Sequence, residues 1–233
     1  MTERERRLAA ALTFERTKMI ITTTKHYSPK TLEEFVFPND EVRELVMAYA
    51  SGDLEKPLLL HGTNGTGKTA IQNLLPNAIE KKKALVNNAK CADLEKASDV
   101  HDLYGRNKHF NRNFKVNDQR YNYIIIEEFK MTKSSLVDAM KVELDATLGT
   151  DMTILSTNHF DLVDRGIISR CEVLLVPPCT PTLFLPHAKK ILDDVGVEID
   201  EQKLFNQLNV VYKMYGDNRK YYSALDHMIR NAA

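Results

Sequence analysis

The stretch HGTNGTGKTA at residues 61–70 has a spacing that could hold phosphate groups. Four residues separate Gly62 from Gly67, and Lys68 and Thr69 follow directly, which is the pattern of a phosphate-binding loop. Glycines let backbone amides approach phosphate oxygens, the lysine supplies positive charge, and the threonine hydroxyl can ligate Mg²⁺. A glycine-rich turn without a ligand is the alternative. The residues expected to bind ATP and Mg²⁺ are Gly62, Thr63, Asn64, Gly65, Thr66, Gly67, Lys68, Thr69 and Ala70.

Two adjacent acids, Glu127 and Glu128, end the stretch YNYIIIEE at residues 121–128. Three successive isoleucines indicate a strand that is buried on both faces, and carboxylates at the mouth of such a strand need a cation, a reacting water or a place on the surface. In a phosphate-loop sheet, the acid that ends a neighbouring strand holds Mg²⁺, and the next acid can polarise the attacking water. We therefore assign Glu127 to the metal and Glu128 to the catalytic base, with two surface acids as the alternative.

The rest of the chain alternates between strand and helix patterns. The clearest helix pattern runs from Ser135 to about Leu148, and five strand candidates are expected at residues 57–62, 83–88, 123–128, 152–158 and 171–176. This alternation predicts an α/β fold with a five-stranded parallel sheet flanked by helices.

A proline-rich stretch, VPPCTPT at residues 176–182, interrupts this alternation. Only helical patterns follow it, and the first is expected to begin at Pro186 and to stop at Gly196. We therefore divide the chain into an N-terminal extension (1–26), a sheet domain (27–178) and a small helical domain (179–233).

Composition limits the class of protein and its location. Acidic and basic residues number 32 each, which argues against a generally cationic nucleic-acid binder. The chain starts without a signal-peptide pattern, and no apolar run approaches the roughly 18 residues that a membrane span needs. The three cysteines show no metal-binding spacing and are odd in number, which fits a reducing compartment. We expect a soluble cytoplasmic protein with no membrane contact.

Residues 104–120 are locally basic. Basic side chains interleaved with aromatic ones can follow a nucleic-acid backbone and stack on bases. The other interpretation, which we favour, is a solvated connecting loop with its aromatic side chains turned inward. The basic residues are Arg106, Lys108, Arg112, Lys115 and Arg120, and the aromatic ones are Tyr104, Phe110 and Phe114.

Several further segments resemble AAA+ ATPases, in particular the small ATPase subunits of sliding-clamp loaders. ILSTNHF at residues 154–160 places Asn158 where the family has a polar sensor that orients the attacking water. Ser169, Arg170 and Cys171 resemble a segment whose arginine reaches the ATP of the neighbouring subunit. The stretch GDNR at residues 216–219 is similar to the second sensor of the family, which makes Arg219 a contact to the γ-phosphate.

The same resemblance extends upstream to a Tyr-x-Pro segment that lies against the adenine in the family. Tyr27 and Pro29 match this segment, and Ser28 stands where the family has arginine. Two other features depart from the family pattern. Glu127 stands in place of an aspartate, and the helical collar of the family does not follow the segment that resembles the lid.

The resemblance implies a P-loop AAA+ domain with a helical lid that binds and hydrolyses ATP in a clamp loader, a phage-like type without the collar being one form. The implied partners are neighbouring AAA+ subunits, a sliding clamp or a helicase, and DNA. Two alternatives stay open. One is another AAA+ protein of DNA transactions, such as a helicase loader or a transposition regulator, and the other is a nucleotide-sensing module that does not hydrolyse ATP.

Overall fold

The computed structural model describes residues 26–114 and 118–232, and its centre is a parallel five-stranded sheet in the order β2-β3-β4-β1-β5. The predicted fold class is therefore confirmed. Helix α5 (Ala97–Phe114) joins β2 to β3 and helix α6 (Ser134–Ala146) joins β3 to β4, because parallel neighbours need a crossover connection. The strands are β1 (Leu58–His61), β2 (Val86–Lys90), β3 (Asn122–Glu127), β4 (Asp151–Thr157) and β5 (Glu172–Leu175).

Strand β2 begins three residues later than predicted. The amide of Ala84 donates to Asn77 Oδ1 (2.8 Å) and that of Leu85 donates to Gln119 Oε1 (2.8 Å). Side chains therefore satisfy these amides, and pairing with β3 starts only at Val86, which lies opposite Tyr123.

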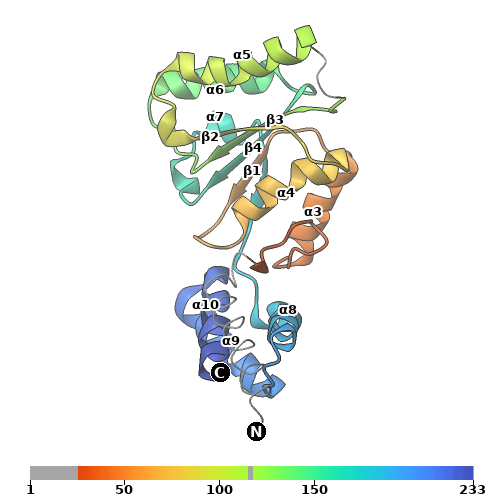
Figure 1. Cartoon of the computed structure of the whole chain (residues 1–233). Helices are drawn as coiled ribbons and strands as arrows, with labels where there is room; N and C mark the ends of the chain where they lie inside the picture. Colours follow the sequence, from red (N-terminus) through yellow and green to blue (C-terminus); the bar gives the residue numbers. More distant parts are fainter. Residues whose placement is uncertain (1–25, 115–117, 233) are drawn as a thin grey trace, which may run out of the picture.

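Helices cover both faces of the sheet (Figure 1). Helices α3 (Asp40–Ser51) and α4 (Lys68–Glu80) cover one face, where they pack on Ile125. The opposite face packs through Ile124 and Ile126 on α5 (Ala97–Phe114), α6 (Ser134–Ala146) and α7 (Arg165–Ile168). The three isoleucines are fully buried, so the prediction that their strand is covered on both faces holds. Short 3₁₀ turns follow β2 and β4, at η1 (Cys91–Asp93) and η2 (Phe160–Leu162).

Helix α5 corrects part of the favoured prediction for the basic stretch, because residues 104–114 are helical rather than a loop, whereas Tyr104 is turned inward as predicted. Val100, Leu103 and Tyr104 are buried at helical spacing, and the Tyr104 hydroxyl lies 3.1 Å from Thr153 Oγ1. This apolar stripe anchors the start of the helix to the sheet. Residues 115–117 and the side chains of 106–114 lie outside the described part, so contact with DNA stays a prediction.

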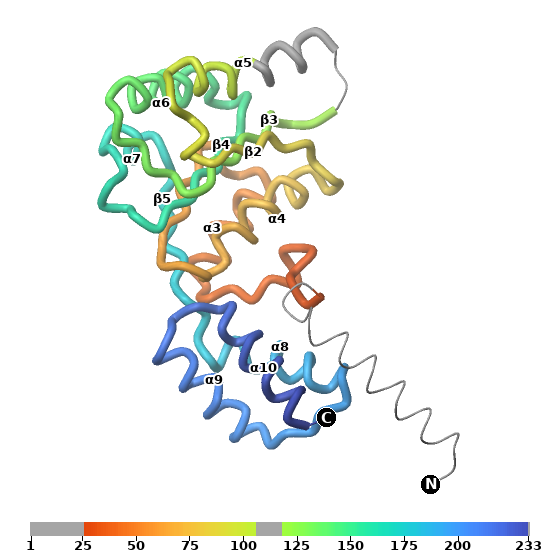
Figure 2. The backbone as a smooth tube through the Cα atoms, turned by 60° about the vertical axis from the view of Figure 1, so that its left-hand side comes forward, coloured from red at the N-terminus to blue at the C-terminus, as the bar shows by residue number. Residues whose placement is uncertain are grey.

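The C-terminal helices α8 (Pro181–Asp194), α9 (Glu201–Tyr215) and α10 (Asn218–Ala232) pack around a core of their own, apart from the sheet (Figures 1 and 2). The predicted helix start at Pro186 is wrong, because α8 begins at Pro181 and contains Pro186. Pro181 suits the first helical turn, where its missing N–H has no partner to lose. Phe184 then anchors this turn by stacking on Tyr221 at 4.5 Å between ring centroids.

None of the helices in residues 26–114 and 118–232 is long and apolar enough to cross a membrane. The division of the chain at residues 26 and 178 stays a prediction. Tyr27 and Val36, which precede the sheet, pack against the core of the C-terminal helices, so that core also draws on residues from before the sheet.

Candidate functional site: a nucleotide pocket

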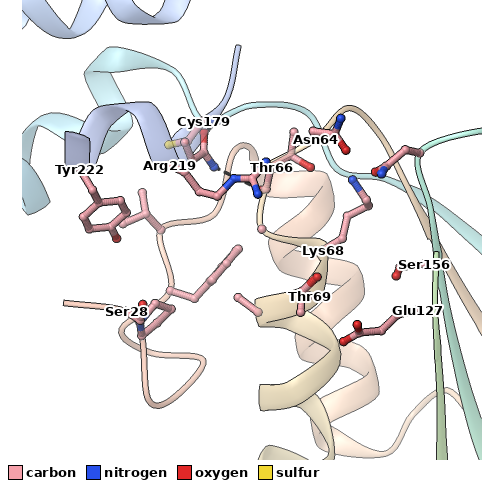
Figure 3. A pocket seen from close by; sticks show the side chains of 18 of the residues that line it. Ser28, Asn64, Thr66, Lys68, Thr69, Glu127, Ser156, Cys179, Arg219 and Tyr222 are labelled. Carbon is pink, nitrogen blue, oxygen red and sulfur yellow. Dashed lines mark hydrogen bonds between the residues drawn. The ribbon is translucent and has the colours of Figure 1, made fainter. Parts of the chain in front are cut away.

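A pocket of about 480 Å³ lies where the carboxyl ends of β3 and β4 meet the loop that follows β1. The C-terminal helices and the segment around residue 29 close its other sides, as Figure 3 shows in close-up. Ligands of open parallel sheets bind at this edge of the strands. Its lining includes Ser28, Pro29, Phe35, residues 64–70, Glu127, Glu128, residues 156–158, Cys179, Phe184, Asn218, Arg219 and Tyr222.

The glycines of the loop at residues 62–67 have positive φ angles, which residues with a side chain rarely adopt. Gly62 has φ 146°, and a Cβ there would lie 2.4 Å from the Val176 carbonyl oxygen. Gly67 has φ 105° and lies against the Phe35 ring, 2.8 Å from where its Cβ would stand. Helix α4 starts directly after Gly67, and no side chain caps its N-terminus. The first amides of α4 are therefore free of a side-chain cap and can bind an anion, so this loop fits the phosphates of a nucleotide.

Lys68 is the buried cation of the pocket, with 7% of its surface exposed. Its Nζ donates hydrogen bonds to the carbonyl oxygens of Gly62 (2.9 Å) and Thr63 (2.6 Å). Burial, together with the positive charge of Arg219, lowers the pKa of Lys68 to about 8. An anion placed beside this ammonium would offset both effects, which favours phosphate binding.

Glu127 and Glu128 differ in backbone conformation at the end of β3. Glu127 is the last residue of the strand and half-buried, and both it and Thr69 line the pocket (Figure 3). Glu128 is exposed and has φ 53°, a left-handed conformation that costs about 1–2 kcal/mol for a residue with a Cβ. This turn lets the amide of the buried Phe129 donate to Ser156 O (2.7 Å), which ties the acid pair to β4.

The donor set at this position suits Mg²⁺ rather than a protein-caged metal. Among the described residues, no group of three or more His, Cys, Asp or Glu side chains could hold a metal ion. Mg²⁺ is commonly bound by one or two protein oxygens together with substrate phosphates and water. The Thr69 hydroxyl and the Glu127 carboxylate can supply those oxygens.

Two of the predicted sensors also line the pocket. Asn158 follows β4 directly and is exposed at the sheet edge. Arg219 comes from the first turn of α10 and pairs with Asp217, with Nε 3.1 Å from Oδ1 and Nη2 2.9 Å from Oδ2. Both residues therefore lie in the same pocket as Lys68 and the two acids.

Four predicted site residues do not line the pocket: Gly62 and Thr63, whose carbonyl oxygens accept from Lys68 at the base of the loop, and Tyr27 and Arg170, which lie elsewhere. Tyr27 does not line the pocket and packs instead against the C-terminal helices, where burial and the neighbouring Asp194 carboxylate raise its pKa. Arg170 forms a two-pronged pair with Asp145, at 2.8 Å for both Nε and Nη2, beside a separate surface hollow. An arginine that serves a neighbouring subunit would also lie away from the pocket of its own chain.

Several residues that line the pocket had no assigned role from the sequence. Tyr222 lies one helical turn after Arg219, so both side chains share one face of α10, and that i, i+3 spacing was the available signal. Asn218 and Cys179 join the pocket only because the C-terminal helices approach the loop, which no local pattern in the sequence reveals.

Comparison with known proteins identifies the family. Residues 58–178 match the ATPase family associated with various cellular activities (AAA), and the chain belongs to this family. It is 26% identical over 196 residues to replication factor C small subunit 1 of Pyrobaculum aerophilum, covering 83% of this chain and 57% of that protein. It is also 21% identical over 226 residues to DNA polymerase III subunit gamma of Buchnera aphidicola, covering 88% of this chain and 60% of that protein.

The likeness to replication factor C subunits confirms the resemblance to clamp-loader-type AAA+ ATPases. The chain spans less than two thirds of the length of these relatives. Among solved structures, the Thermotoga maritima RuvB Holliday junction branch migration motor shares the fold with a TM-score of 0.58 and 14% identity, covering 88% of this chain and 72% of that one.

The depressed pKa of Lys68 predicts that nucleotide affinity falls as the pH rises. Phosphate favours the protonated lysine, which is the main form below pH 8 and is lost above it, so affinity should fall by up to about tenfold per pH unit above that value. Titration of the protein with ATP between about pH 7 and 9.5 measures this dependence. Lys68→Arg keeps its charge throughout this range. It should bind with little pH dependence, and an equally flat curve for the wild type would contradict the assignment.

Proposed function

We propose that this chain binds ATP with Mg²⁺ in the pocket and hydrolyses it as a subunit of a clamp-loader-type assembly in DNA replication. One observation carries the proposal. The phosphate loop, the acid pair at the end of β3, the polar residue after β4 and an arginine of the C-terminal helices line a single pocket. Separate surface features would have no reason to meet in this way.

The proposed roles follow from position and chemistry. Residues 64–70 and Lys68 hold the phosphates, while Thr69 and Glu127 hold Mg²⁺, which offsets phosphate charge when bound. Glu128 accepts the proton of the attacking water, and Asn158 orients that water. Glu127 is one methylene longer than aspartate and half-buried, so it can reach a metal directly or through water.

Assembly is part of the same proposal. The small replication factor C subunit to which this chain is similar is named as a subunit, which supports a complex of several AAA+ chains. Arg170 lies outside the pocket of its own chain and is one third exposed, so a neighbouring chain can reach it. We assign it to the ATP of that neighbour, where a guanidinium stabilises the charge of the transferring phosphoryl group.

The partners expected from the sequence belong to this proposal as well. A sliding clamp and primer-template DNA are the partners that we favour, and a helicase is the alternative. The Tyr27 assignment to the adenine is not carried forward, because Ser28 and Pro29 line the pocket in its place.

Glu128→Gln is expected to bind ATP within about threefold of the wild type while losing at least about 100-fold in turnover, because an amide cannot accept a proton from water. Binding by calorimetry and phosphate release measure the two effects. Glu127→Gln is the matched comparison, because it makes the same chemical change one residue earlier. If Glu127→Gln stops turnover and Glu128→Gln does not, the two roles are reversed. If neither variant nor the wild type releases phosphate, the chain is a nucleotide-sensing module.

Arg170→Ala should bind ATP normally and hydrolyse it about 10³-fold more slowly, the scale of arginine fingers in other phosphate-loop enzymes. Mixing it with Glu128→Gln should restore part of the activity, because some interfaces then pair an intact Glu128 with an intact Arg170. Phosphate release from the mixed proteins is the measurement.

Asp145→Asn is the matched control, because it breaks the same ion pair and leaves the arginine in place. A role across the interface predicts that Asp145→Asn stays active. A purely structural pair predicts instead that both substitutions lower the melting temperature alike and that mixing recovers nothing.

A further inference from the structure

Asn218, the first residue of α10, connects three separate segments of the chain. Its backbone amide donates to Gly65 O (3.1 Å), and its side-chain Nδ2 donates to Thr66 O (3.2 Å). Its Oδ1 accepts a hydrogen bond from the amide of Cys179 (2.9 Å), in the connection between β5 and α8. One half-buried side chain thus contacts the phosphate loop and the start of the C-terminal helices at the same time.

The contact between α10 and the loop is close at the next residue as well. Gly65 has φ 70°, and the Asp217 carboxylate occupies the space that a Cβ at Gly65 would take. Because Gly65 has no Cβ, the turn at residues 216–218 can pack directly against the phosphate loop. The side chain of Asp217 is only 16% exposed, which shows how closely this turn is packed.

These contacts fix the backbone immediately before Arg219. The Arg219 amide donates to Asp217 Oδ1 (2.9 Å). The backbone of Arg219 is therefore held by Asp217, in a turn that Asn218 fixes to the phosphate loop and to Cys179. In the hydrogen bonds of the Asn218 side chain, Nδ2 donates to Thr66 O and Oδ1 accepts from the amide of Cys179. Although Asn218 lines the pocket, its two donors are engaged by the carbonyl oxygens of Gly65 and Thr66, which favours an action on the ligand through the loop and through Arg219.

We infer that Asn218 is a positioning residue that holds the first turn of α10 on the phosphate loop and thereby sets the reach of Arg219 toward the terminal phosphate of the nucleotide. The inference rests on the proposed function, since it assigns the residue to the same site. It predicts that Asn218 matters for ATP more than for ADP, because only ATP has the phosphate that Arg219 is proposed to contact.

The test is a double-mutant cycle on the ratio of ADP to ATP dissociation constants, measured by calorimetry with Mg²⁺ on the full chain. Asn218→Ala is expected to lower the preference for ATP by about three- to tenfold, the effect of two lost neutral hydrogen bonds, with ADP affinity changed by less than about twofold. Arg219→Ala should lower the preference by about tenfold or more. The double variant should match Arg219→Ala within about twofold, because removing the arginine also removes what Asn218 positions.

Asn231→Ala is the matched control, because it removes the same side chain from an exposed site near the end of α10. It should change neither the nucleotide preference nor the melting temperature. Effects of Asn218→Ala and Arg219→Ala that simply add, or equal weakening of ATP and ADP with a lower melting temperature, would overturn the inference in favour of a purely structural role.

Hydrogen exchange on the nucleotide-free protein gives a second, independent measurement. Asn218→Ala should speed exchange at the amide of Cys179, which the Asn218 side chain protects, while Asn231→Ala should not. Unchanged exchange at Cys179 would show that the contact is absent and would overturn the inference. If the wild type binds neither nucleotide, the proposed function fails, and the exchange measurement still decides whether Asn218 holds this turn.

Discussion

The pairing of β4 between β3 and β1 is the constraint on which the site depends. Ile126, Leu155 and Leu59 lie opposite one another across the three strands, so the strands end at one level. The acid after Ile126 and the loop after β1 must therefore lie on either side of the end of β4. Because helices bury both faces of this sheet, its carboxyl edge is the place where polar groups can meet a ligand, and the fold concentrates them there.

Two positive charges of the pocket, on Lys68 and Arg219, lie close enough to suit an anionic ligand. The Lys68 ammonium is held by backbone carbonyls, which are dipoles and leave its charge uncompensated. Burial and then the charge of Arg219 lower the pKa of Lys68, and the Asp217 carboxylate partly opposes this effect. The site thus keeps two cations near each other at a cost that phosphate oxygens would offset.

Local patterns predicted the features that depend on a few adjacent residues. The glycine spacing and the isoleucine run each determine their own backbone, so the sheet and the phosphate loop could be foreseen, whereas the left-handed turn at Glu128 could not. The site assignments themselves stay predictions. The extent of α5, the pairing of Arg170 with Asp145 and the contact of Asn218 with the loop depend on segments that meet only after folding, 25 to 152 residues apart for the two pairs. Tyr27 shows the same limit, because its packing partners lie in the C-terminal helices.

The two arginines assigned to phosphate, Arg170 and Arg219, each pair with an aspartate. The two pairs differ in the free energy that is lost when the arginine moves away from its aspartate. Arg170 is one third exposed and Asp145 is well exposed, so water can solvate the carboxylate once the arginine leaves, and a pair of this kind contributes little to stability. Asp217 is largely buried against Gly65, so moving Arg219 away would leave a poorly solvated carboxylate beside the phosphate loop. Arg170 can therefore exchange its pair with Asp145 for a contact to a neighbouring chain at little cost in stability. Breaking the Arg219 pair is therefore more costly than breaking the Arg170 pair, which favours a guanidinium that stays beside the phosphate loop, where Asn218 holds the turn at residues 216–218.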